Sequence, residues 1–212
     1  MHANCCAHKE RPILFSGPMV RAILEGRKTV TRRVVKPQPD FLGSMVDPNT
    51  PFKTLDAGLH ARITCPHGQP DDRLWVREAW AADAQVDAIA PRDLSQGEPI
   101  WYPADFSVRQ TGCSMISKGR GRPSIHMPRW ASRILLEITA VRIERLQDIS
   151  EKQALAEGVE LEGEGVCWAG AAGTASDNPV ESFRLLWELI NGAGSWNANP
   201  WVWVVEFKRV TP

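Results

Sequence analysis

The densest group of reactive side chains in this 212-residue chain is the octapeptide Gly26–Arg33, GRKTVTRR. It combines one amine, two hydroxyls and three guanidiniums. A lysine whose pKa is lowered by burial or by nearby cations can act as a base, and a hydroxyl beside it can act as a nucleophile. Lys28 is the candidate base and Thr31 the candidate nucleophile. The octapeptide is therefore interpreted as the floor of a binding or catalytic pocket.

The elements on either side of the octapeptide decide whether Lys28 and Thr31 can meet. A short helix should precede it, because Ser16–Gly17–Pro18 resembles a helix start and Gly26 suits the left-handed position after the last turn. A strand should follow, from Val30 until Pro37 stops it. Alternate strand residues point to opposite faces. Lys28 and Thr31 can therefore converge only if Lys28 still belongs to the turn after Gly26.

A candidate acid lies far along the chain, at Glu157. Ser150 and Gln153 form a capping-box pattern that begins a short helix, and Gly158 ends it. A carboxylate in the last turn opposes the helix dipole, at a cost of about 0.3–1 kcal/mol. Glu157 is therefore either an ordinary surface acid or a functional one that orients Lys28 or passes a proton to a leaving amine.

Two further segments are candidates for binding. The run Leu74–Trp80 predicts a strand in which Arg77 and Glu78 form either a pocket wall or a surface ion pair. Between Asp105 and Glu137 the chain has no acid but many basic residues, with Trp101 and Trp130 near its ends. This segment suits phosphate contacts and base stacking, or its charges pair with acids elsewhere. The net charge of zero means that nucleic-acid binding would depend on a local patch.

The remaining pattern predicts a single, mostly β domain with flanking helices. Strands are expected at 12–15, 100–102, 134–146 and 201–207, the third with a slip in register, and an amphipathic helix at 179–189. Strands are not regularly interleaved with long helices, which favours a small β-barrel with helices at its rim. Residues 1–10 are expected to be a flexible tail. Residues 11–212 form the domain, with irregular insertions at 36–72, 83–130 and 160–178.

Composition and cysteine usage narrow the class of protein. The five cysteines show no C-x-x-C spacing, and no apolar run approaches 18 residues. A reduced, cytoplasmic protein without a membrane span is expected. Cys5, Cys6 and His8, and separately Cys65 and His67, are weak candidates for zinc ligands. No metal and no cofactor are expected.

The chain resembles ASCH-domain proteins, which have a PUA-like β-barrel fold, and among them a group found in phages and prophages. The resemblance is carried by residues spread over most of the chain: Ile13–Phe15, the helix ending in Gly26–Arg33, Asp72–Glu78, Ile149–Ala154 with Glu157–Gly158, and Val204–Phe207. Some small bacterial members are amidohydrolases that act on N4-acetylcytidine. Their lysine, threonine and glutamate match Lys28, Thr31 and Glu157. The three insertions have no counterpart in those small enzymes, which leaves the substrate open.

Three functions follow as expectations. The first is an amidohydrolase that removes an acyl group from a modified cytidine nucleoside or base. The second is a non-catalytic module that binds RNA or DNA, and the third is a nuclease or an accessory phage protein. The residues expected to contact substrate or nucleic acid are Arg27, Thr29, Arg32, Arg33, Trp75, Arg77, Glu78, Arg120, Arg122 and Arg129.

Overall fold

A five-stranded sheet forms the centre of the molecule, in the order β1-β6-β9-β12-β2. The computed structural model describes residues 8–43, 47–55, 58–110 and 112–210. The sheet consists of β1 (Glu10–Leu14), β2 (Val30–Val34), β6 (Arg73–Arg77), β9 (Leu135–Arg145) and β12 (Trp201–Val210). Strands β1 and β6 run parallel, and the other neighbours are antiparallel. The chain is thus mixed α/β with mostly strands, as expected.

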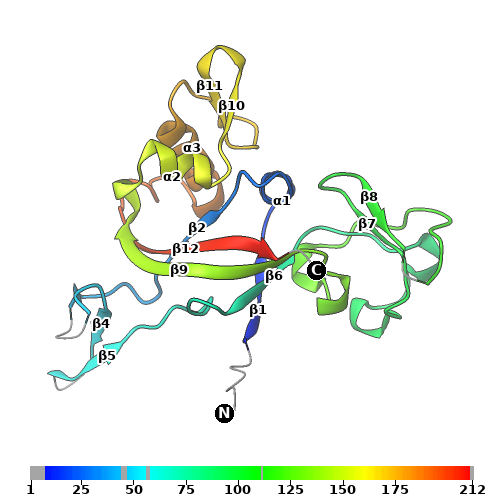
Figure 1. The fold of residues 1–212 in the computed structure, drawn as a ribbon, viewed down its shortest axis with the longest axis horizontal. Helices are drawn as coiled ribbons and strands as arrows, with labels where there is room; N and C mark the ends of the chain where they lie inside the picture. The colour runs from blue at the N-terminus through cyan, green and yellow to red at the C-terminus, as the bar shows by residue number, and fades with distance from the viewer. Residues whose placement is uncertain (1–7, 44–46, 56–57, 111, 211–212) are drawn as a thin grey trace, which may run out of the picture.

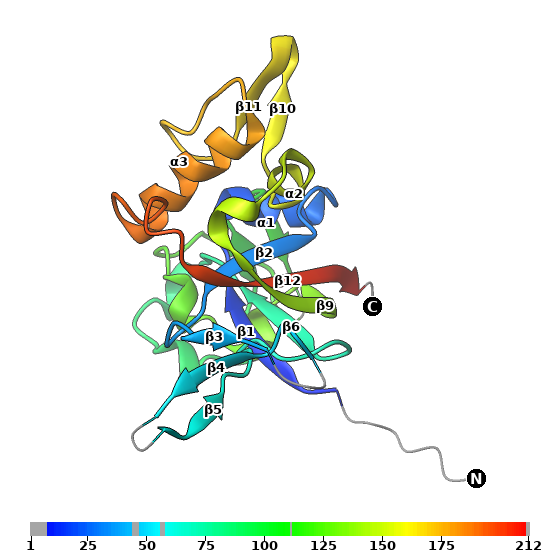
Figure 2. The same cartoon turned by 90° about the vertical axis from the view of Figure 1, so that its left-hand side faces the viewer.

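The sheet is open in its backbone pairing. Strands β1 and β2 are its two edges, and no ladder between described residues joins them. Figures 1 and 2 show β9 and β12 as a long curved pair that crosses the middle of the molecule. One side chain reaches across the two edges, because Arg33 Nη2 on β2 donates a hydrogen bond of 2.7 Å to the carbonyl of Leu14 on β1. A closed barrel is therefore not formed by the strands themselves.

The long strands show the irregularity that the sequence indicates. Glu206 lies opposite Ala140, and the next residue, Phe207, lies opposite Ile138. Thr139 is therefore an extra residue on β9, which is a β-bulge. Strand β12 is buried on both faces, since Val204 belongs to one hydrophobic core and Val205 to another.

The helices pack against both faces of this sheet, because Val20 and Ile23 of the first helix share a core with Val205, whereas the other two helices share a core with Val204. They are α1 (Gly17–Leu24), α2 (Glu151–Ala156) and α3 (Pro179–Asn191), close to their expected positions. Both halves of the capping box are formed at α2, between Ser150 and Gln153. The second core packs α2 and α3 against β12 and the start of β2 (Figure 2). None of the helices in the described ranges is long and apolar enough to cross a membrane.

The three insertions were expected to be irregular, but each of them contains short paired strands. The first contains a small sheet of β3 (Phe41–Leu42), β4 (Pro51–Thr54) and β5 (His60–Arg62). The second contains the pair β7 (Ile100–Tyr102) and β8 (Ser107–Arg109), with a core of its own around Trp80 and Met127. The third contains the pair β10 (Glu160–Glu162) and β11 (Val166–Trp168). Strands of two to four residues are too short to show a hydrophobic period.

The N-terminal tail lies mostly outside the described residues, as do Cys5 and Cys6. The first strand begins at Glu10, two residues earlier than the sequence pattern indicates.

Candidate active site

Lys28 and Glu157, which are 129 residues apart in the chain, meet in a buried ion pair. The Lys28 Nζ atom lies 2.7 Å from Glu157 Oε2, and the two residues are only 2% and 6% exposed. Nζ also donates to the backbone carbonyls of Val30 at 2.8 Å and of Glu157 at 2.7 Å. Each proton of the ammonium group therefore has an acceptor.

The turn after α1 places Lys28 at this position. Gly26 adopts a φ of 77°, and the N–H groups of Arg27 and Lys28 both donate to the carbonyl of Ala22. Strand β2 begins only at Val30. Lys28 thus belongs to the turn, which is the condition that the sequence sets for Lys28 and Thr31 to converge.

Gly158 makes the approach of α2 to this turn possible. Its φ is 102°, and a Cβ atom at this position would lie 3.1 Å from the Ala22 Cβ and 3.4 Å from the Lys28 Cβ. A side chain would be both strained and crowded there. The N–H of Thr29 then donates to the carbonyl of Ala156, which joins β2 directly to the end of α2.

Arg32 extends the ion pair into a network of four charges. Its Nη1 lies 3.2 Å from Glu157 Oε1, and its Nη2 lies 3.3 Å from Glu144 Oε2 on β9. We refer to Lys28, Arg32, Glu144 and Glu157 as the Glu157 cluster. Each oxygen of the Glu157 carboxylate faces a different cation, so its position is fixed from two sides.

The burial of Lys28 changes its acidity. Desolvation lowers its pKa from the ordinary value of 10.5, because a charged ammonium is unfavourable inside the protein. Glu157 opposes this shift, while the positive charges of Arg33 and Arg32 add to it, and the net direction is downward. A lowered pKa increases the population of the neutral amine at a given pH, and a general base must be in this neutral form.

A cavity of about 250 Å³ lies between β2 and α3, next to this cluster. Thr31 and Glu157 both line it, but the Thr31 side chain, opposite Val205 on β12, lies on the other face of β2 from the one that α3 covers. Lys28 does not line this cavity and lies behind Glu157. The opposite wall is apolar and comes from Met19 and from α3, through Phe183, Leu186, Trp187 and Ile190. Sequence analysis recognised this apolar stripe of α3 only as core.

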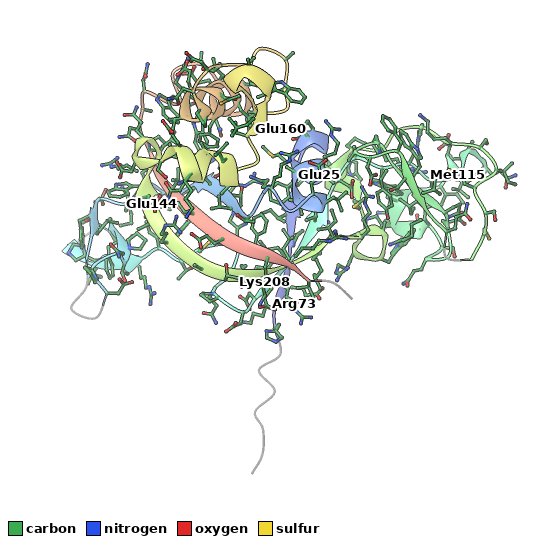
Figure 3. The ribbon with its side chains drawn as sticks, turned by 45° about the horizontal axis from the view of Figure 1, so that its top comes forward. Glu25, Arg73, Met115, Glu144, Glu160 and Lys208 are labelled. Atoms are coloured by element: carbon green, nitrogen blue, oxygen red, sulfur yellow. The ribbon has the colours of Figure 1, made fainter. Side chains whose placement is uncertain are left out.

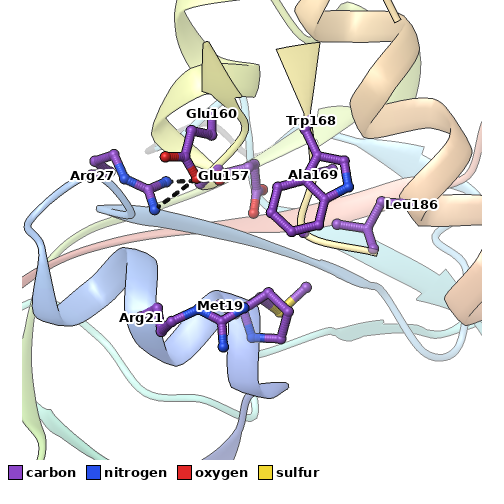
Figure 4. A pocket seen from close by; sticks show the side chains of 11 residues that line it. Met19, Arg21, Arg27, Glu157, Glu160, Trp168, Ala169 and Leu186 are labelled. Atoms are coloured by element: carbon purple, nitrogen blue, oxygen red, sulfur yellow. Dashed lines mark hydrogen bonds and ion pairs between the residues drawn. The ribbon is translucent and has the colours of Figure 1, made fainter. Parts of the chain in front are cut away.

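A second, small hollow of about 20 Å³ lies on the other side of Glu157 (Figure 4). Met19, Glu157 and Leu186 line both spaces. Arg27 reaches this hollow, where it donates to the carbonyl of Gly158 at 3.2 Å and pairs with Glu160 at 3.3 Å. The hollow is too small for more than a water-sized group, so Arg27 fixes the rim of the site.

The remaining octapeptide residues also gather here. Arg33 also lines the cavity, but its guanidinium lies over the Phe15 ring, 5.4 Å from its centroid, and bonds the carbonyl of Leu14. Thr29 is exposed at the start of β2. The sequence therefore located the site through Gly26–Arg33 and Glu157, but it missed Glu144 and Lys36, which have no neighbouring signal.

The predicted binding residues on β6 and just after it make structural contacts and do not line the cavity. Trp75 is buried, with the Arg77 guanidinium over its ring at 4.6 Å. Glu78 is 1% exposed and accepts two hydrogen bonds of 2.9 Å from Arg133. Arg133 also donates to Asp105 and Ser107 and stacks on Tyr102. We call Glu78, Arg133, Asp105 and their partners Ser107 and Tyr102 the Arg133 cluster. Glu78 is neither a surface charge nor part of the cavity wall.

Of the two alternatives left open for the basic segment, pairing with acids elsewhere holds for part of it, since Arg129 and Arg133 form ion pairs. Arg122 is buried, and its guanidinium donates to the carbonyls of Ile89 and Val86. Arg129 pairs with Glu10 at 2.8 Å, and only Arg120 of the predicted three extends into solvent without such a contact. Figure 3 shows Met115, from this insertion, at the opposite end of the molecule from Glu144 of the Glu157 cluster. The acids that neutralise the segment come from distant parts of the chain.

A larger cavity, of about 760 Å³, lies under the first insertion and along β9 and β12. None of the predicted catalytic or binding residues lines it. The part of the chain that the structure describes contains no group of three or more His, Cys, Asp or Glu side chains arranged to hold a metal ion.

Comparisons with protein-family models, with curated proteins and with solved structures found no match for this chain. Its function is therefore argued from the geometry of the Glu157 cluster and the adjoining cavity.

Proposed function

We propose that this protein is an amidohydrolase of the ASCH type that removes an acyl group from the exocyclic amine of a modified cytidine nucleoside or base. The observation that carries the proposal is the buried contact between Lys28 and Glu157, whose ammonium group also bonds the carbonyl of Val30, the residue before Thr31. The curled sheet, with Arg33 linking its two edges, is consistent with the PUA-like barrel of that family.

The chemistry begins with a proton transfer inside the ion pair. Along the 2.7 Å hydrogen bond, Lys28 passes a proton to Glu157, which leaves a neutral amine and a carboxylic acid. Burial makes this exchange accessible, because it disfavours charge on both groups. The pair then holds a base and an acid side by side.

Acyl transfer follows in two halves. Thr31 Oγ1 attacks the acyl carbon and its proton goes to Lys28, while the C–N bond breaks and Glu157 protonates the departing amine. Water then attacks the acyl-threonine ester and gives a proton to Glu157. Lys28 returns a proton to the Thr31 oxygen, and the carboxylic acid is released. Both residues end in the neutral state in which they began.

The walls of the cavity suit this substrate class. The apolar side chains of α3 offer a flat surface for a pyrimidine ring and its acyl group. Polar and charged groups come from the β2 side, from Glu157 and from Asn191 at the end of α3. The nucleic-acid-binding alternative is less well supported, because Arg122 and Arg129 are engaged by other protein groups.

The test is turnover of N4-acetylcytidine by the purified protein, followed by chromatography of the cytidine released. The wild type should hydrolyse it, and Thr31→Val should lose about a thousandfold or more in kcat, since it retains the shape but not the hydroxyl. Thr139→Val is the matched control, because Thr139 is an exposed threonine on β9 of the same sheet. Its activity should be unchanged. Absence of turnover by the wild type, or full activity in Thr31→Val, would refute the proposal.

A further inference from the structure

A chain of alternating charges leads from the buried ion pair to the surface of the sheet. Arg32 joins Glu157 to Glu144, one carboxylate on each side of its guanidinium. The other oxygen of Glu144 accepts a hydrogen bond from Arg142 Nε, and Arg142 Nη1 donates in turn to Glu206. The side chain of Arg32 has no exposed surface, whereas that of Glu206 is 43% exposed. Glu144 is therefore the acid that meets the innermost arginine from the solvent side.

The register of the sheet explains why these side chains meet. Arg32 on β2 lies opposite Val204 on β12, and Val204 lies opposite Arg142 on β9. Glu144 is two residues beyond Arg142, so it is on the same face of the sheet. The Arg32 side chain thus crosses over β12 to reach β9. Val202 and Val204 on β12 have no exposed surface, so the charges meet over an apolar floor.

The carboxylate of Glu144 offsets the positive charge of Arg32. Each of the two acids takes one terminal nitrogen of the guanidinium. Without the charge of Glu144, Arg32 would be offset by Glu157 alone and would stabilise the charged form of that carboxylate more strongly. The proposed mechanism requires the opposite, because Glu157 must accept a proton from Lys28.

The same reasoning applies to Lys28 itself. Burial lowers its pKa most, Glu157 raises it, and the positive charges of Arg33 and Arg32 lower it further. Glu144 carries the opposite charge and lies against Arg32, so it counteracts the contribution of Arg32. Removing the charge of Glu144 should therefore lower the pKa of Lys28 further, while the contribution of Arg33 stays as it is.

We propose that Glu144 is a positioning residue of the candidate active site. It holds one side of the Arg32 guanidinium and offsets its charge, so that Glu157 remains able to receive the proton of Lys28. The inference rests on the proposed function, because it takes this proton transfer as the first step of the reaction. Glu144 does not line the cavity next to the cluster, so it has no contact of its own with a substrate there.

The first experiment follows the ionisation of Lys28 without any substrate. The NMR signal of the Lys28 Cε carbon, assigned by its absence from Lys28→Met, is titrated against pH in the wild type and in Glu144→Gln. Glutamine can still accept a hydrogen bond from Arg32, so this variant removes the charge and keeps the contact. The Lys28 midpoint should fall by about 0.5–1 pH unit, the size of one charge acting from the neighbouring ion pair.

Two variants serve as controls. Glu137→Gln removes an acid of similar exposure that pairs with Lys208 at the other end of β9, and it should leave the Lys28 midpoint unchanged. Glu144→Asp keeps the charge and should also leave the midpoint close to that of the wild type. An unchanged or higher midpoint in Glu144→Gln, or an equal shift in either control, would overturn the proposal. A Glu144→Gln protein that no longer folds would also overturn it, because Glu144 would then serve chiefly the fold.

The second experiment measures the hydrolysis of N4-acetylcytidine by the same variants against pH. In Glu144→Gln, kcat should fall about tenfold with KM unchanged, and the alkaline limb of kcat/KM should move to lower pH together with the Lys28 midpoint. A shifted midpoint in a protein without hydrolytic activity would keep the effect of Glu144 on Lys28 and refute the hydrolase. Hydrolysis that is the same in the wild type and in Glu144→Gln would leave the hydrolase standing and refute the role of Glu144.

Discussion

Two buried charged clusters lie among the described residues, and only one of them borders any of the three cavities described above. In the Arg133 cluster, the guanidinium donates to Glu78, Asp105 and Ser107 and stacks on Tyr102 at 4.0 Å. In the Glu157 cluster, Lys28 and Arg32 face Glu157 and Glu144. Both join segments that are far apart in the chain, and both are well hydrogen-bonded.

The difference between the clusters lies in what surrounds them. The Arg133 cluster has two acids for one base and lies beside the small core of the second insertion, and none of the three cavities described above is lined by its charged residues. The Glu157 cluster borders a cavity of about 250 Å³, because Arg32 and Glu157 both line it. The Arg133 cluster therefore suits a structural role, whereas the Glu157 cluster is placed where a ligand could reach it.

Removing the cation should affect stability most in the Arg133 cluster. Arg133→Met leaves the Glu78 carboxylate buried without a partner, and we expect a loss of about 3–5 kcal/mol in the free energy of unfolding. Lys28→Met leaves Glu157 still bonded to Arg32, so its loss should be smaller, about 1–3 kcal/mol, while hydrolysis is abolished. Urea unfolding of both variants measures the difference. A larger loss for Lys28→Met would show that the Glu157 cluster is chiefly structural.

Crowding at Gly158 should be the next largest effect. Gly158→Ala forces a Cβ into a space bounded by Ala22 and Lys28 at a φ of 102°, and we expect a loss of about 2 kcal/mol together with reduced hydrolysis. Gly192→Ala is the control, because Gly192 has a φ of 96° but nothing within 4 Å of the added Cβ. Gly192→Ala should lower the free energy of unfolding through backbone strain, but it should leave hydrolysis unchanged. If both variants lose activity equally, the contact between α2 and the Lys28 turn does not matter for the site.

The parts of the site that the sequence predicted depend on local signals. Gly26 ends α1, Ser150 and Gln153 start α2, and the parity of β2 identifies the turn that must hold Lys28. Each signal acts within about one helical turn or a few strand residues, so it can be interpreted without knowing the fold. The position of Glu157 at a helix end, unfavourable by itself, is explained by the two cations that face it.

The remaining features depend on contacts between distant residues. Glu78 and Arg133 are 55 residues apart, and Arg129 pairs with Glu10 across 119 residues. The segment after Asp105 therefore looked like an unneutralised basic patch when only its neighbours in the chain were considered. Similarly, an apolar stripe such as that of α3 looks the same whether it covers a core or lines a cavity, because both environments favour the same side chains.

The two clusters should also differ in how they make the stability of the protein depend on pH, although this effect is smaller than those of the substitutions above. Because the pKa of Lys28 is lowered in the folded protein, the unfolded chain binds more protons between that lowered pKa and 10.5. Stability should therefore rise as the pH is raised through this window, by at most about 1.4 kcal/mol per pH unit. Hydrolysis should fall over the same interval, because the pair of Lys28 and Glu157 loses the proton that Glu157 gives to the departing amine. Urea unfolding and kcat/KM, each measured against pH, test the two expectations.

Lys28→Met is the control for the pH profile of stability. It should remove the contribution of this window from the stability curve, whereas Arg133→Met should retain it, because Arg133 does not contact Lys28. A stability curve that is the same in the wild type and in Lys28→Met would mean that Lys28 stays fully charged up to its ordinary range. The ion pair would then be a fixed structural contact like that of Arg133, and the distinction between the two clusters would rest on the cavity alone.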